Sequence, residues 1–182
     1  MVSLHLTLTL LINFSLLQLG KGFDDCSRSN IEVISGIEPS ADPMTTMTAS
    51  SERDPDHGAD KGLALGKTGW SPRTAQRGEW LEADIGSWAY IKQVRIVTRT
   101  PGLRVKVEAS MDLQDWTLAD KMISKGEYIK AEFSRPVMAQ FVRVTVTKVT
   151  RDVELEMIVI GCKRRRGVAV EHRLFSEYSG GR

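Results

Sequence analysis

Residues 103–109 read Leu-Arg-Val-Lys-Val-Glu-Ala, a strict alternation of apolar and charged side chains. Successive side chains of a β-strand point to opposite faces, so this pattern predicts a strand with one buried and one wetted face. Residues 142–147, Val-Arg-Val-Thr-Val-Thr, alternate in the same way with β-branched residues. The two stretches together indicate a domain built around antiparallel sheet.

Three further segments are strand candidates with less regular alternation: residues 80–85, 91–98 and 153–160. Turn-forming glycines and prolines separate the strand candidates from one another. No stretch has the periodicity of a long amphipathic helix, and no internal repeat is found. Short strands at this spacing predict an all-β antiparallel sandwich or barrel.

The chain has 182 residues, of which 41% are hydrophobic and 26% charged. This composition is typical of one globular domain and excludes wholesale disorder, collagen and a polytopic membrane protein. The net charge is +2, but residues 163–182 are strongly basic and residues 23–162 are mildly acidic. Nucleic-acid binding needs a basic folded part, so we do not expect a nucleic-acid partner.

The N-terminus has the features of a secretory signal. Residues 6–19 are mostly Leu and Ile, too few to span a bilayer comfortably, and Gly20 and Gly22 follow. We therefore expect residues 1–22 to be a signal peptide, with an uncleaved anchor or an N-terminal core strand as the alternatives. No second apolar run has membrane length, so the mature protein is expected to be secreted and extracellular, without a transmembrane segment.

The chain contains two cysteines, Cys26 and Cys162. An even number in an oxidising compartment predicts one disulfide, and the spacing resembles no zinc motif. The bridge would close a single domain at residues 23–162 and join its two ends. The basic tail, residues 163–182, is expected to be disordered when free. Residues 163–166 (Lys-Arg-Arg-Arg) are then a solvated run, an anchor for anionic lipid or sulfated glycan, or a protease processing site.

Six fragments between the cysteines resemble, in order, the discoidin domain, also called the coagulation factor V/VIII type C domain, of the galactose-binding-like superfamily. They are residues 47–51 (MTASS), 69–72 (GWSP), 79–86 (EWLEADIG), 110–112 with Trp116, 139–144 (AQFVRV) and 160–162 (IGC). The resemblance implies a jelly-roll β-sandwich that binds phospholipids, glycans, collagen or other extracellular proteins through loops at one end. Residues 52–68, 98–103 and 111–130 would be those loops.

The first of these loops contains two sets of candidate ligand-binding residues. Asp54, Asp56 and Asp60 alternate around a glycine and offer the hard oxygens that calcium prefers, although a solvated acidic turn is the simpler interpretation. Leu63 and Leu65 are candidate tips for phospholipid binding, but we prefer to place them in the core beneath the loop.

A glycan site would use an aromatic platform with nearby cations. Trp70, Arg73, Arg77 and Arg99 are the candidates, and a buried core position is the alternative for Trp70. No nucleophile–base pair, metal triad or phosphate loop is evident, so an enzyme is not expected.

The sequence thus predicts a secreted, non-catalytic module for a cell-surface or matrix ligand, active in cell adhesion. The alternatives are a calcium-dependent lectin, an anionic-phospholipid binder and a self-assembling subunit, in which case the protein would be an oligomer.

Overall fold

The computed structural model describes residues 31–34, 45–63, 68–149 and 151–163. These residues form eight β-strands and two short 3-10 helices. The helices are η1 (Pro55–His57) and η2 (Ala59–Gly62), both in the connection before β3. The strands are β1 (Ile31–Ile34), β2 (Thr46–Ala49), β3 (Trp80–Thr98), β4 (Arg104–Ser110), β5 (Trp116–Leu118), β6 (Lys121–Lys125), β7 (Tyr128–Lys148) and β8 (Leu155–Lys163).

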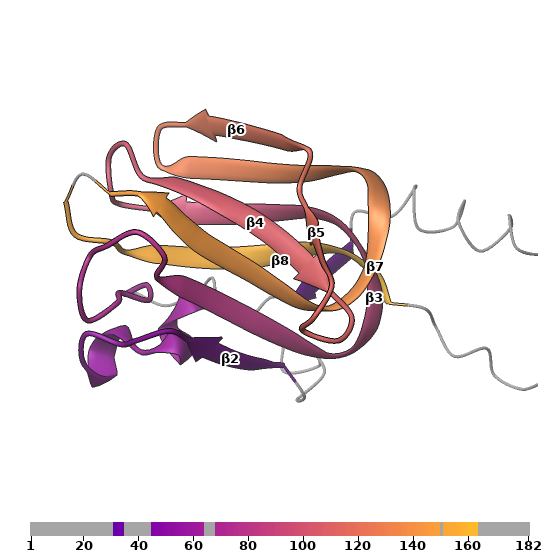
Figure 1. The fold of residues 1–182 in the computed structure, drawn as a ribbon, viewed down its shortest axis with the longest axis horizontal. Helices are drawn as coiled ribbons and strands as arrows, with labels where there is room; N and C mark the ends of the chain where they lie inside the picture. Colours follow the sequence, from indigo (N-terminus) through magenta and orange to yellow (C-terminus); the bar gives the residue numbers. More distant parts are fainter. Residues whose placement is uncertain (1–30, 35–44, 64–67, 150, 164–182) are drawn as a thin grey trace, which may run out of the picture.

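Two long antiparallel strands, β3 and β7, organise the whole fold (Figure 1). Their first pairing runs from Trp80 opposite Thr145 to Asp84 opposite Phe141, and it resumes at Ala89 after an irregularity. Gly86 lies in that interruption with a φ of 70°, a left-handed value that glycine adopts without strain. The strands bend there, so each contributes one half to each of two layers.

The two layers have different sets of neighbouring strands. The first half of β3 and the second half of β7 are extended by β2 on one side and by β4 and β5 on the other. The remaining halves are extended by β6 on one side and by β8 and β1 on the other. All these pairings are antiparallel, so the predicted all-β antiparallel sandwich is confirmed.

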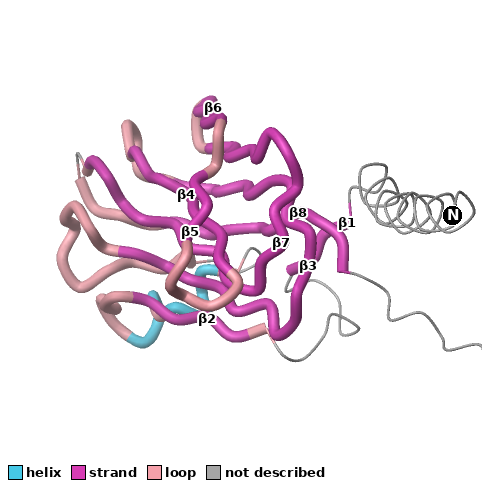
Figure 2. Tube along the Cα trace, turned by 45° about the vertical axis from the view of Figure 1, so that its right-hand side comes forward, coloured by secondary structure: helices cyan, strands magenta, loops and turns pink. Residues whose placement is uncertain are grey.

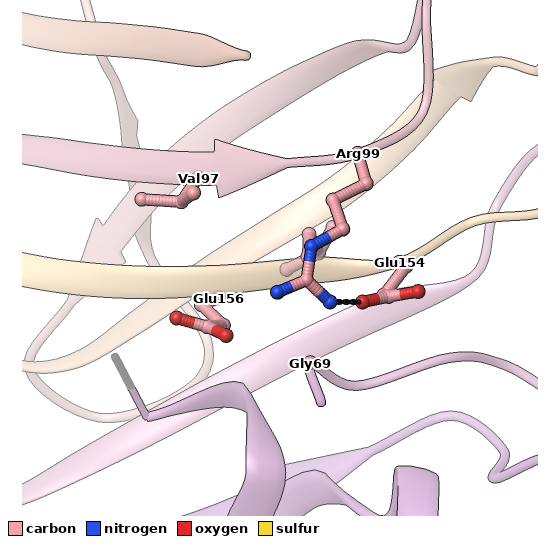
Figure 3. A pocket seen from close by; sticks show the side chains of 6 residues that line it. Gly69, Val97, Arg99, Glu154 and Glu156 are labelled. Atoms are coloured by element: carbon pink, nitrogen blue, oxygen red, sulfur yellow. Dashed lines mark hydrogen bonds and ion pairs between the residues drawn. The ribbon is translucent and has the colours of Figure 1, made fainter. Parts of the chain in front are cut away.

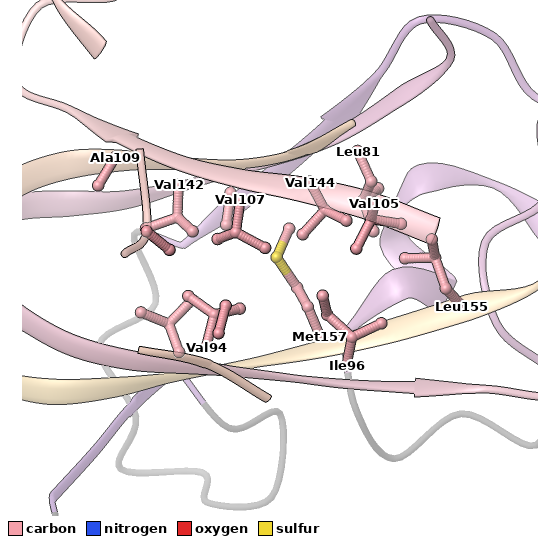
Figure 4. Close-up of a cluster of buried hydrophobic side chains, with 14 of the residues drawn as sticks. Leu81, Val94, Ile96, Val105, Val107, Ala109, Val142, Val144, Leu155 and Met157 are labelled. Atoms are coloured by element: carbon pink, nitrogen blue, oxygen red, sulfur yellow. The ribbon is translucent and has the colours of Figure 1, made fainter. Parts of the chain in front are cut away.

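The core lies between the layers and consists mainly of β-branched and other aliphatic side chains. Val107, Val142 and Val144 of one layer face Val94 and the Met157 side chain of the other (Figure 4), and all five are buried. The alternation that the sequence showed in residues 103–109 and 142–147 is the alternation between this core and the surface.

Two sequence expectations about the strands need correction. Residues 80–85 and 91–98 belong to the single strand β3, because the chain bends at Gly86 without leaving the sheet. Residues 111–130 are not one loop, since they contain β5, β6 and the start of β7. β6 escaped detection because all five of its residues are exposed, which leaves no apolar alternation.

Several predictions lie outside the described residues: the signal peptide at residues 1–22, Cys26, Leu65, and all of the basic tail after Lys163. Cys162 is buried near the end of β8, and its bridge to Cys26 stays a prediction. None of the helices described here is long and apolar enough to cross a membrane.

Candidate functional site

Four connections gather at one end of the sandwich, and we call this region the loop end (Figure 2). Of the described residues it comprises 50–63, 68–79, 99–103, 126–127, 149 and 151–154, because strand register places the strand termini that flank these segments together. The predicted binding loop at residues 98–103 and the described part of the predicted loop at residues 52–68 belong to it. Residues 111–115 connect β4 to β5 at the opposite end, so they cannot join the same site.

A buried carboxylate, Glu79, braces the longest of these connections. Its side chain accepts hydrogen bonds from Ser50 Oγ at 2.5 Å, Ser51 Oγ at 2.7 Å and Gln76 Nε2 at 3.0 Å. Burial by itself would raise the pKa of Glu79, but these three hydrogen bonds and the charge of Arg73 together outweigh it and hold the pKa below the ordinary value. The charged carboxylate therefore ties the start of the connection to its end.

Trp70 is a core residue and not a platform for a ligand. Its side chain is fully buried, its Nε1 donates to the carbonyl oxygen of Ser51 at 2.9 Å, and its backbone exchanges two hydrogen bonds with Leu155. The ring face cannot meet a sugar, so the prediction of Trp70 as an exposed ligand-binding residue is wrong. It joins Ser51, near the start of the long connection, to Leu155 at the start of β8.

Two of the three predicted calcium-binding aspartates, Asp54 and Asp60, have partners within the loop itself. Asp54 Oδ1 accepts from the backbone N–H of Asp56 at 2.9 Å and lies 2.7 Å from His57 Nδ1, and the His57 hydrogen bond lowers the pKa of Asp54. Asp60 instead pairs with Lys61 at 2.6 Å. The described residues contain no group of three or more His, Cys, Asp or Glu side chains that could hold a metal ion. Calcium binding stays a prediction that this geometry does not support.

Leu63 is half-buried and packs against the hydrophobic core, where its backbone forms an isolated bridge with Met157. This contact with the core agrees with the preferred interpretation of Leu63 as a core residue, and its part in membrane binding stays a prediction.

Arg99 lies in a small hollow of the loop end beside a carboxylate from the neighbouring connection. Its Nη1 donates to Glu154 Oε1 at 2.5 Å, and Figure 3 shows Glu156 on the other side of the guanidinium. The hollow holds only about 20 Å³, far less than the several hundred Å³ of pockets that enclose small ligands. A ligand at this place would lie across the surface.

Two threonines fix the connection that carries Arg99. Thr98 Oγ1 donates to the carbonyl oxygen of Glu154, and Thr100 Oγ1 donates to that of Asp152, both at 2.7 Å. These bonds hold residues 98–100 against residues 152–154, so the Arg99–Glu154 pair is positioned before any ligand arrives.

Arg73 and Arg77 lie exposed on the last part of the long connection. The backbone N–H of Arg73 donates to Ser51 Oγ at 3.1 Å, which places this segment within the Glu79 network. Neither guanidinium forms an ion pair with any of the described residues, so both can contact a ligand.

One constellation that the sequence did not reveal lies on the outer face of the β4–β7–β3 layer. The Arg143 guanidinium stacks between two indole rings, 4.8 Å from the centroid of Trp80 and 4.2 Å from that of Trp116. It also donates to Glu82 Oε2 from Nε at 2.8 Å. These four residues come from three strands, so only the sheet register brings them together.

Comparison with protein families gives a match to the F5/8 type C domain over residues 46–158. The chain belongs to this family. The match confirms the resemblance to discoidin domains, and F5/8 type C domains are in general non-catalytic modules that bind carbohydrates or other ligands. No curated protein matches the chain.

Solved structures share the fold of this F5/8 type C domain at low sequence identity. Discoidin II of Dictyostelium discoideum has 12% identity and a TM-score of 0.56, covering 66% of this chain and 56% of that one. The family 32 CBM of Clostridium perfringens NanJ, solved with galactose, has 18% identity, coverages of 64% and 93%, and a TM-score of 0.54. A chitosan-binding module from a Paenibacillus chitosanase/glucanase, solved with chitotriose, has 20% identity, coverages of 64% and 95%, and a TM-score of 0.53.

Proposed function

We propose that this F5/8 type C domain is a secreted, non-catalytic module that binds a carbohydrate of the cell surface or matrix at its loop end, in the service of cell adhesion. The observation that carries the proposal is the braced set of polar side chains there. Arg99 and Glu154 form a fixed donor–acceptor pair, and Arg73 and Arg77 lie exposed on a loop tied down by Glu79.

The chemistry of this set suits sugar hydroxyl groups, each of which can accept from a guanidinium and donate to a carboxylate. Both partners are already in place, so little side-chain entropy is lost on binding. The galactose and chitotriose complexes of two structural neighbours support a carbohydrate ligand. Phospholipid is less favoured, because Leu63 packs against the core.

The proposal is tested with the secreted chain on a glycan array, with calcium and with chelator, followed by affinity measurement on the best sugar. Arg99→Ala should weaken binding at least tenfold, because it removes the donor and disrupts the pair. Lys106→Ala is the matched control: it also removes an ion-paired, half-exposed cation, but on β4 away from the loop end.

Each outcome of this experiment decides a point. Loss of glycan binding in chelator would indicate that calcium takes part in binding and would support Asp54, Asp56 and Asp60 as its ligands. Absence of binding to every glycan on the array, or equal affinity of Arg99→Ala and wild type, would overturn the carbohydrate proposal. A multimer that binds no glycan and no liposome would favour the self-assembling subunit.

A further inference from the structure

The outer face of the layer formed by β6, β7 and β3 has an excess of cations. Strand register sets three rows of outward side chains across it: Lys121, Glu132 and Gln93, then Ile123, Lys130 and Arg95, then Lys125, Tyr128 and Val97. The alternate residues of β3 and β7 are buried in the core, which fixes the outward direction of these rows. We call the following residues the basic face: Lys92, Arg95, Lys121, Lys125 and Lys130.

The basic face is not neutralised from within. Lys130 and Arg95 are direct cross-strand neighbours, an arrangement of like charges that destabilises a sheet. Lys130 pairs with Glu132 at 2.5 Å, but no ion pair with any described residue involves Lys92, Arg95, Lys121 or Lys125. The Lys130 hydrogen bond lowers the pKa of Glu132, and the charges of Lys121 and Lys92 add to this effect. Glu132 thus pairs with one lysine and lies close enough to two others for their charges to act on it.

The outer face of the other layer provides a contrast. There Arg143 pairs with Glu82, and Lys106 pairs with Glu108. On β4 Arg104 is also exposed, without an ion pair to a described residue. The basic face has five cations, with Glu132 and, on the neighbouring β8, Glu156 as acids, so it is the more positive of the two outer faces.

We propose that the basic face is a second binding surface, separate from the loop end, for an extended anionic polysaccharide. Lys121 and Lys125 are about 13 Å apart at the rise of a β-strand, and β6, β7 and β3 together span about 10 Å. Cations spread over such a strip suit the repeated charges of a linear polymer better than one isolated anion. The polymer would relieve the repulsion between Lys130 and Arg95.

The apolar residues among the cations also favour a polysaccharide over a membrane. Tyr128 is 58% exposed and Ile123 is 39% exposed; they lie between the lysines and can contact the faces of sugar rings. Membrane docking uses large apolar side chains that insert below the headgroups. Ile123 is in the middle of a strand and Tyr128 begins one, so neither stands at the tip of a long loop.

The test uses the full chain and immobilised heparin as the probe, with affinity measured over a series of NaCl concentrations. Lys130→Gln/Arg95→Gln should weaken binding about 25-fold near 0.15 M salt, at about fivefold for each basic residue removed from an anionic surface. It should also flatten the salt dependence. Arg104→Gln/Lys106→Gln is the matched control, with the same loss of charge from exposed positions on β4.

Three further measurements complete the test. Thermal unfolding of Lys130→Gln/Arg95→Gln should show a melting temperature no lower than that of wild type, because relief of the like-charge pair offsets the loss of the exposed Lys130–Glu132 ion pair. Arg164→Gln/Arg165→Gln tests the tail as the rival source of heparin affinity. Arg99→Ala should leave heparin binding unchanged, which separates this surface from the loop end.

The proposal is overturned if wild type does not bind heparin, or if the basic-face variant loses no more affinity than the β4 control. It is also overturned if the tail variant alone abolishes binding, or if vesicles containing phosphatidylserine are bound and heparin is not.

Discussion

Removal of the Arg143 side chain should be among the most damaging single changes on the surface of the sandwich. The Glu82 side chain that it pairs with is only 9% exposed, and Arg143 itself is 27% exposed. Loss of one partner leaves a nearly buried carboxylate without its cation, which costs about 3–5 kcal/mol for a fully buried pair. The two indole contacts add about 0.5–1 kcal/mol each at exposed sites.

Partial exposure of the guanidinium reduces the cost of leaving Glu82 without its cation. We therefore expect Arg143→Ala to lower the free energy of unfolding by about 3–4 kcal/mol. The assay is equilibrium unfolding in urea, followed by the fluorescence of Trp80 and Trp116, whose rings flank the guanidinium. Lys106→Ala is the control, because it removes a half-exposed ion pair and should cost less than about 1 kcal/mol.

A double variant checks the physical cause. Glu82→Gln/Arg143→Met removes both charges and keeps much of the volume, so it should be more stable than Arg143→Ala. A cost for Arg143→Ala as small as that of Lys106→Ala would refute this reasoning. Equal stability of the double variant and Arg143→Ala would show that packing, and not the stranded carboxylate, sets the cost.

Three other changes probe the loop end and the sheet. The pKa of Glu79 in the folded state is lowered from 4.5. The ionised Glu79 therefore contributes stability above pH 4.5, and this contribution is lost as the pH falls through the lowered pKa. Glu79→Gln should flatten the acid side of a plot of the urea midpoint against pH, and an unchanged plot would contradict this. Gly161→Ala would place a methyl group against the carbonyl oxygen of Tyr90. We expect the free energy of unfolding to fall by about 3 kcal/mol, or no folded protein to form. A melting curve like that of wild type would argue against so close an approach of β8 to β3. Trp70→Phe removes the hydrogen bond to the Ser51 carbonyl oxygen and should cost about 1 kcal/mol, with faster amide exchange in residues 50–79 as the sign that the brace has loosened.

The strands that the sequence predicts are those with one solvent-exposed and one buried face. β4 and the second half of β7 fulfil this condition, and their alternation is readable residue by residue. β6 has two wet faces, so its five residues carry no such signal. Gly86 looks like a strand terminator in sequence, yet the long pairing of β3 with β7 carries the chain through it as a bend.

The candidate site shows a similar division between local and distant information. Residues 52–68 and 98–103 are identifiable as loops from their local composition, and the fold places residues 98–103 and the described part of residues 52–68 at the loop end. The pairing of Arg99 with Glu154 joins residues 55 positions apart, and that of Arg143 with Glu82 joins residues 61 positions apart. The basic face could not be predicted for the same reason. Its cations lie on three strands, and residues 23–162 as a whole are mildly acidic.

The sharing of β3 and β7 between both layers has a mechanical consequence. In a sandwich whose layers were joined only by loops, the two sheets could separate while each sheet kept its own hydrogen bonds. Here β3 and β7 continue from one layer into the other, so the layers stay joined by paired strands at the bend and cannot separate there without disturbing the β3–β7 pairing. A pull applied along β8 is therefore resisted by the pairing of β8 with β3 and, through β3, by β7 in both layers. In the adhesive role proposed above, the same two strands that shape the domain would also set the force at which the domain unfolds.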